Sequence, residues 1–146
     1  MKKIVIANWG ASKQGKTSTI KLLIEIIKQR NSGAKLDRPI TGVYDIRVII
    51  TLTSGIKIGI ETAGDPGSPL EESLDEFVKN NCDVIICCTR TKGKTERLVD
   101  NLAIKHKYEI VWVTNYRSNE LRIDKLNQLS AEKFYELLDR RMNNLI

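Results

Sequence analysis

The segment that most constrains this chain occupies residues 10–17 and has the pattern G-x-x-x-x-G-K-T. It reads Gly10-Ala11-Ser12-Lys13-Gln14-Gly15-Lys16-Thr17. A short apolar run at 3–8 precedes it, and residues 17–30 follow with isoleucines and leucines at helical spacing. This order predicts a buried strand, a tight turn and a helix that packs back onto the strand, as in a layered α/β domain.

Each defined position of this segment has a physical use. Glycines at both ends of the turn let the backbone fold tightly, so that successive N–H groups turn toward an anion. The helix that begins near Lys16 brings the positive end of its dipole to the same place. The Lys16 ammonium is expected to reach the outer phosphates of a nucleotide, and the Thr17 hydroxyl to bind Mg²⁺. The expected nucleotide-binding residues are Gly10, Ala11, Ser12, Lys13, Gln14, Gly15, Lys16, Thr17 and Ser18.

Strands and helices are expected to alternate along the rest of the chain. Two alternating apolar runs at 43–52 and 56–60 flank a Gly-containing turn, which predicts an antiparallel hairpin. Residues 34–42 resemble a polar connection. Further helices are expected at 68–80, 95–105 and 130–143, and further strands at 83–89 and 109–114. The 146 residues predict one α/β domain with about five mostly parallel strands, one antiparallel edge strand and helices on both faces.

The strand, the 10–17 segment and the helix together resemble the P-loop NTPases. In the Ras-like small GTPases of that superfamily, a loop with a magnesium-contacting Thr, an antiparallel hairpin and D-x-x-G follow. Here Thr41 precedes the hairpin, and Glu61-Thr62-Ala63-Gly64 ends it, so the resemblance covers roughly residues 1–90. It implies a three-layer P-loop NTPase fold. It also implies Mg²⁺ held by Thr17, Thr41 and Glu61, and a Gly64 N–H that senses the terminal phosphate. Residues 34–42 and 64–69 would then be switch segments that contact a protein partner.

The chain departs from the Ras-like pattern at two places. Asp65 stands where that family has its water-orienting Gln, and it is a candidate catalytic residue. The guanine-reading N-K-x-D is absent, and Asn115 is the residue after the last expected strand that is a candidate for contacting a base. The resemblance is therefore to a truncated or divergent member, and ATP is at least as well supported as GTP.

A basic segment at 90–97 follows the strand expected at 83–89. As a lid it would place Arg90 or Arg97 against the phosphates as an arginine finger, and the alternative is a solvated loop. The three cysteines, Cys82, Cys87 and Cys88, lack the spacing of a zinc site or a disulfide framework, which favours a reducing cytoplasm. No apolar run approaches the roughly 20 residues that span a bilayer.

The formal net charge of +6 favours anionic partners and excludes an acidic, solvating chain. Nucleic acid stays open as a partner, although no motif for reading it is present. Three functions remain: Mg²⁺-dependent binding and hydrolysis of ATP or GTP, used as a molecular switch; transfer of the γ-phosphate to a nucleotide or small metabolite; and nucleotide binding with little turnover. The sequence favours the first.

Overall fold

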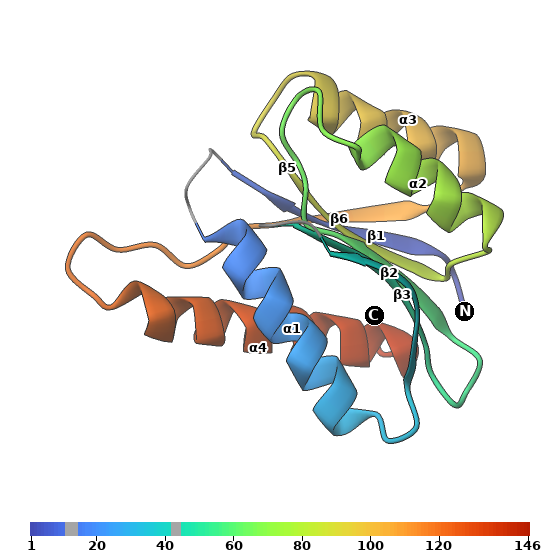
Figure 1. Cartoon of the computed structure of the whole chain (residues 1–146), viewed down its shortest axis with the longest axis horizontal. Helices are drawn as coiled ribbons and strands as arrows, with labels where there is room; N and C mark the ends of the chain where they lie inside the picture. Colours follow the sequence, from blue (N-terminus) through green and yellow to red (C-terminus); the bar gives the residue numbers. More distant parts are fainter. Residues whose placement is uncertain (11–14, 42–44) are drawn as a thin grey trace.

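The computed structural model describes residues 1–10, 15–41 and 45–146 of the chain. Strands and helices alternate through this part, with three strands in succession after the first helix (Figure 1). In chain order the elements are β1 (Ile4–Trp9), α1 (Lys16–Arg30), β2 (Lys35–Thr41), β3 (Ile46–Thr51), β4 (Lys57–Glu61), α2 (Leu70–Lys79), β5 (Val84–Thr89), α3 (Lys94–His106), β6 (Glu109–Val113) and α4 (Ile123–Met142).

The strands form one mixed sheet in the order β2-β3-β4-β5-β1-β6. β1 lies parallel between β5 and β6, and β4 is parallel to β5. β3 is antiparallel to both of its neighbours, β2 and β4. The predicted α/β class and the antiparallel hairpin are therefore confirmed for the described residues. The sheet separates β1 from β4 by one strand, β5.

The antiparallel hairpin lies toward one edge of the sheet as expected, but the expected number of about five strands is one too few. The described residues form six strands, and the edge beyond the hairpin is β2, whose residues the sequence assigned to a polar connection. Its sequence, KLDRPIT, lacks apolar alternation, and its pairing with β3 shifts register between Asp37 and Ile40. An edge strand pairs on one side only, so it tolerates charges and a proline that a central strand would exclude.

Two helices cover each face of the sheet (Figure 1). α1 and α4 pack on one face through their apolar stripes, and α2 and α3 pack on the other. The first core is rich in isoleucines of β1, β3 and β4, and the second includes Phe77 of α2 and Tyr108. Alternate residues of a strand point to opposite faces, and both faces are covered by helices, so the central strands β1 and β5 are nearly continuous apolar runs.

α4 begins at Ile123, seven residues before the start that was expected from its apolar pattern. Its early turns carry few apolar residues, but Leu126 and Asn127 are buried there. Packing against α1 extends the helix beyond the stretch that its own sequence pattern indicates. No helix among the described residues has the length and the apolar composition that a bilayer crossing would need.

Candidate functional site

A cavity of about 550 Å³ lies at the edge of the sheet where the parallel strands end. Four chain segments meet there: the start of α1, the start of β3, the segment after β4 and the end of β5. The lining residues are Gly15, Lys16, Thr17, Ser18, Asp45, Thr62, Ala63, Gly64, Asp65, Ser68, Cys88 and Arg90. Ligands of open α/β sheets bind at this edge, so the cavity is the candidate site.

Lys16 begins α1 directly after Gly15, whose φ of 76° belongs to the left-handed region. Its Nζ donates hydrogen bonds to the carbonyl oxygens of Gly10 at 2.5 Å and Thr89 at 2.9 Å, which join the ends of β1 and β5. Burial lowers the pKa of Lys16, and the neighbouring Arg90 lowers it further. The structure therefore holds a partly desolvated cation at the N-terminal end of a helix.

The other expected phosphate-binding residues divide into two groups. Thr17 and Ser18 line the cavity, as the motif requires. Ala11, Ser12, Lys13 and Gln14 lie outside the described residues. Gly15 also faces α4, since a Cβ added to it would approach Oδ1 of Asn127 to 2.6 Å. Gly15 is thereby packed against α4.

Gly64, Asp65 and Arg90 come together at the cavity, as the sequence analysis expected. Gly64 packs so closely on β5 that an added Cβ would overlap the backbone carbonyl of Cys88. Arg90 Nε donates a 2.8 Å hydrogen bond to Asp65 Oδ1. Arg90 thus reaches the site, although in this structure its partner is a carboxylate of the same chain.

Glu61 does not line the cavity, and its side chain points to the face of the sheet that α2 covers. It is 2% exposed, and its Oε1 accepts a hydrogen bond from the hydroxyl of Ser73 on α2. Its Oε2 accepts a 3.1 Å bond from the Ala63 N–H, and Arg47 lies 3.4 Å from Oε1. These contacts make Glu61 a structural link between β4 and α2. Its expected role as a magnesium ligand stays a prediction that the geometry does not favour.

Two further expected residues have a structural setting that differs from the one the sequence suggested. The backbone of Thr41 ends β2, where its Cα pairs with Ile46, so it belongs to a strand and not to the expected loop. Asn115 is buried between β1 and α1, where it accepts a 3.0 Å bond from Asn8 and donates a 2.8 Å bond to Thr19. This position suits an amide that ties α1 to the sheet better than one that contacts a base.

Sequence reasoning missed Asp45 and Thr62, which both line the cavity. Thr62 is the second residue of the 61–64 segment, and the local pattern indicates its neighbour Glu61, since a carboxylate at a strand end suits Mg²⁺. A strand's side chains alternate between faces, so of these two neighbours only Thr62 faces the cavity. Asp45 stands just before β3, and no local pattern marks it as a site residue.

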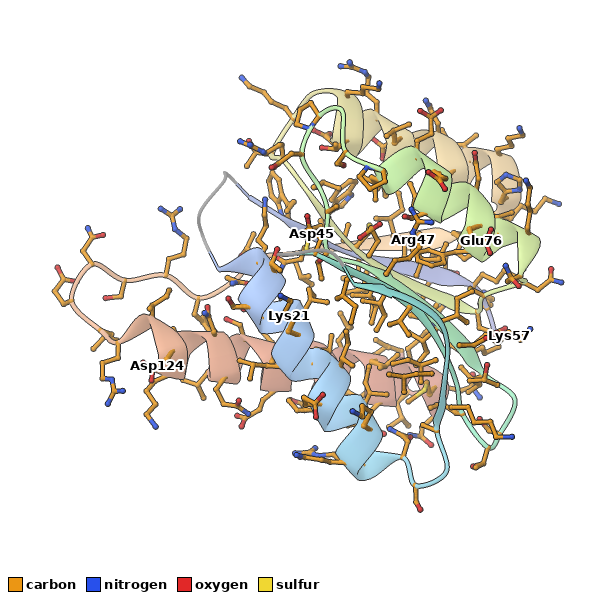
Figure 2. The ribbon with its side chains drawn as sticks, in the orientation of Figure 1. Lys21, Asp45, Arg47, Lys57, Glu76 and Asp124 are labelled. Atoms are coloured by element: carbon orange, nitrogen blue, oxygen red, sulfur yellow. The ribbon has the colours of Figure 1, made fainter. Side chains whose placement is uncertain are left out.

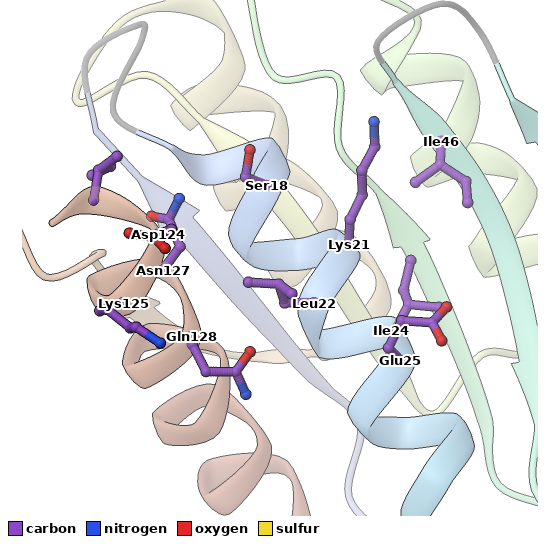
Figure 3. Close-up of a pocket in the computed structure, with 11 residues that line it drawn as sticks. Ser18, Lys21, Leu22, Ile24, Glu25, Ile46, Asp124, Lys125, Asn127 and Gln128 are labelled. Carbon is purple, nitrogen blue, oxygen red and sulfur yellow. The ribbon is translucent and has the colours of Figure 1, made fainter.

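A larger cavity of about 820 Å³ lies along α1 and is bordered by the first turns of α4 (Figure 3). Its apolar walls include Leu22 and Ile46, and Ser18 borders both cavities. This cavity runs beside the helix, whereas the smaller one receives the helix N-terminus with its free N–H groups. The smaller cavity is therefore the better candidate for an anionic ligand.

Comparison with known proteins gives little to place beside this geometry. No family model matches the chain, and no curated protein matches it. Among solved structures it is similar to a structure of EndoMS in apo form, with 13% sequence identity and a TM-score of 0.38. The match covers 73% of this chain and 49% of that chain, so this chain spans about half the length of that structure.

The family expected from the sequence is corrected by these findings. The assignment to the P-loop NTPases, as a truncated or divergent Ras-like GTPase, is wrong: no family model matches the chain. The resemblance rested on two short segments, 10–17 and 61–64, and the carboxylate of the second, Glu61, is buried away from the cavity. A glycine-lysine turn at a helix N-terminus nevertheless attracts anions through its charge and N–H groups, whatever the family.

Proposed function

We propose that this chain binds a nucleoside triphosphate, ATP or GTP, together with Mg²⁺, and hydrolyses it. The observation that carries the proposal is the position of Lys16, whose half-buried ammonium stands on the cavity at the N-terminal end of α1. Arg90 reaches the same cavity from the end of β5. Two cations and a helix N-terminus that converge on one cavity suit a chain of phosphates.

Phosphate would compete for the hydrogen bonds that Lys16 now makes to two carbonyl oxygens. A bond from ammonium to a charged phosphate oxygen is stronger than one to a neutral carbonyl, so the exchange is favourable. Burial has lowered the pKa of Lys16, and a neighbouring anion would raise it again. The lysine would therefore bind phosphate as the ammonium.

The oxygen donors of the cavity also suit Mg²⁺, which prefers hydroxyl, carboxylate, phosphate and water ligands. Thr17 supplies a hydroxyl, and Asp45 supplies a carboxylate. The ion, when bound, would neutralise charge on the outer phosphates. The neighbouring residues 64–69 would respond to the terminal phosphate, and we propose that this segment presents the bound state to a protein partner.

Binding with little turnover is a second candidate, and one observation favours it. The carboxylate expected to be catalytic, Asp65, directs its Oδ1 to Arg90 and not to a water molecule. The carboxylate expected to hold Mg²⁺, Glu61, is engaged by Ser73 and Arg47. The same cavity would also serve phosphoryl transfer to a small acceptor, so acceptors belong in the assay.

The described cysteines are buried, free thiols, which fits the cytoplasmic location that we propose.

Calorimetric titration with ATP, GTP and their diphosphates tests the proposal, with the variants Lys16→Ala and Lys21→Ala compared. Lys21 is an exposed lysine of the same helix and does not line the smaller cavity, so it controls for the loss of one positive charge (Figure 2). We expect the first variant to lose most of the triphosphate affinity and the second to keep it. Equal affinities for wild type and Lys16→Ala would overturn the proposal.

Release of inorganic phosphate then separates the alternatives. Release without any acceptor supports hydrolysis, and transfer that depends on an added nucleotide or metabolite supports a phosphotransferase. Tight binding without release supports the binding module.

A further inference from the structure

Asp45 reaches the candidate site because β3 runs against the other central strands. The parallel strands β1, β4 and β5 end at the cavity, and antiparallel β3 therefore begins there. Asp45 is the residue directly before β3 (Figure 2). It lines the cavity together with Thr17 and Lys16. Asp45, which is distant from Lys16 and Thr17 in sequence, thus adds a carboxylate to the cavity that they line.

The carboxylate of Asp45 is oriented by a hydrogen bond. The hydroxyl of Thr62 donates to Asp45 Oδ1 at 3.1 Å, and the same hydroxyl accepts the Ile46 N–H at 2.9 Å. Because Thr62 is 2% exposed, the donor is fixed by the sheet. Within the described chain, Asp45 has no cationic side chain at ion-pair distance, which leaves its second oxygen to a ligand. Glu61 in contrast already has three partners.

A buried hydroxyl on the same cavity also lacks a partner. Ser68 Oγ has almost no exposed surface and makes no hydrogen bond within the described part of the structure. Buried polar atoms are rarely left unpaired in native proteins, so an unpaired one on a cavity wall points to a ligand. The atom is independent of Asp45, since it comes from the segment that precedes α2.

We propose that Asp45 is the carboxylate ligand of the divalent cation that accompanies the triphosphate, with the Thr17 hydroxyl as the second protein oxygen. The inference rests on the proposed function and specifies its metal site. Phosphate oxygens and water complete the set that Mg²⁺ prefers. Thr62 acts on the metal by orienting Asp45, as partners of metal ligands commonly do. The assignment replaces Glu61 as the metal carboxylate.

Mn²⁺ titration followed by electron paramagnetic resonance tests the assignment, because the signal of free Mn²⁺ falls as the ion binds. The titration uses the full chain with a non-hydrolysable triphosphate analogue, and compares wild type with Asp45→Asn, Glu61→Gln and Asp75→Asn. Asparagine retains an oxygen for the Thr62 hydroxyl and removes the charge. Asp75 is an exposed aspartate of α2 outside this cavity and serves as the charge control.

We expect Asp45→Asn to weaken Mn²⁺ binding by about tenfold or more, since even indirect partners of a metal ligand change affinity by about 10–100-fold. Asp75→Asn should match wild type. Wild-type Mn²⁺ affinity in Asp45→Asn, or a loss confined to Glu61→Gln, would overturn the assignment. Thermal melts identify any variant that fails to fold.

Failure of this inference can be distinguished from failure of the proposed function. If wild type binds the triphosphate analogue in EDTA or with metal, and Asp45→Asn keeps full metal affinity, only the metal assignment fails. If wild type binds no triphosphate under either condition, the proposed function itself fails, and the assignment fails with it.

Discussion

Arg90 Nε donates a 2.8 Å hydrogen bond to Asp65 Oδ1, which ties the segment after β5 to the segment after β4 across the cavity. The Asp65 side chain is 65% exposed and that of Arg90 is 33% exposed, so the pair is open to solvent. Exposed pairs contribute little to stability. The contact matters more for binding, because an anionic ligand must compete with Asp65 for the guanidinium.

We expect Asp65→Asn to raise the affinity for ATP or GTP by up to about fivefold, because exposed ion pairs are worth about 0.2–1 kcal/mol. Arg90→Ala should lower the affinity, since it removes a cation from the cavity. Calorimetric titration at fixed salt measures both changes.

Asp124→Asn is a matched control for Asp65→Asn. Asp124 Oδ2 accepts a hydrogen bond of 2.8 Å from Arg122, also in an exposed pair, and does not line the smaller cavity. This variant should leave the affinity unchanged. A lower affinity in Asp65→Asn would show that Asp65 assists ligand binding and does not compete with it.

Replacing Lys16 by Met should stabilise the fold at neutral pH and remove triphosphate binding. Burial holds the pKa of Lys16 below its ordinary 10.5, so the folded state disfavours the ammonium. Between the folded pKa and 10.5 the unfolded chain binds more protons, and the stability of wild type therefore rises with pH across that window. The difference in unfolding free energy between Lys16→Met and wild type should therefore shrink as the pH rises across the same window.

Urea unfolding of wild type and Lys16→Met at a series of pH values measures this difference. In Lys16→Met no ammonium titrates at this position, but the two hydrogen bonds of Lys16 to carbonyl oxygens are lost as well. If Lys16→Met were less stable than wild type at neutral pH, those two contacts would outweigh the penalty of burying the charge.

Ser73→Ala should destabilise the fold by about 1–3 kcal/mol, because it removes a hydrogen bond from the buried carboxylate of Glu61. Denaturant unfolding measures the loss. Ser54→Ala is the control, since Ser54 is exposed and accepts a long 3.4 Å bond from the Ile56 N–H. An unchanged stability in Ser73→Ala would mean that water or Arg47 replaces the hydroxyl.

Gly64→Ala should damage both stability and ligand binding, because its Cβ would overlap the backbone carbonyl of Cys88 and force β5 to shift. Overpacking of this kind costs about 1–3 kcal/mol. Gly67→Ala in the same segment meets no atom within 4 Å, although its φ of 80° adds strain of about 1–2 kcal/mol. Melting curves measure the stability of both variants. Triphosphate titrations should show loss of binding in Gly64→Ala and not in Gly67→Ala.

Local patterns predicted most elements of the fold. The apolar runs and helical spacings located β1, α1, α2, β5, α3 and β6 to within a few residues. They missed β2, because an edge strand needs no apolar alternation, and they started α4 late, because contact with α1 supports its first turns. Both errors lie where a neighbouring element supplies the stability that the segment's own sequence lacks.

The sequence by itself determined the left-handed Gly15 that precedes α1 and the order of the elements other than β2, because these depend on glycine conformation and on apolar periodicity along the chain. It also indicated Lys16, Asp65 and Arg90, since each follows a strand end that parallel pairing brings to one edge. The tertiary structure alone decided which carboxylates face the cavity. Strand direction places Asp45 there, and strand alternation turns Glu61 to the other face, where Ser73 binds it.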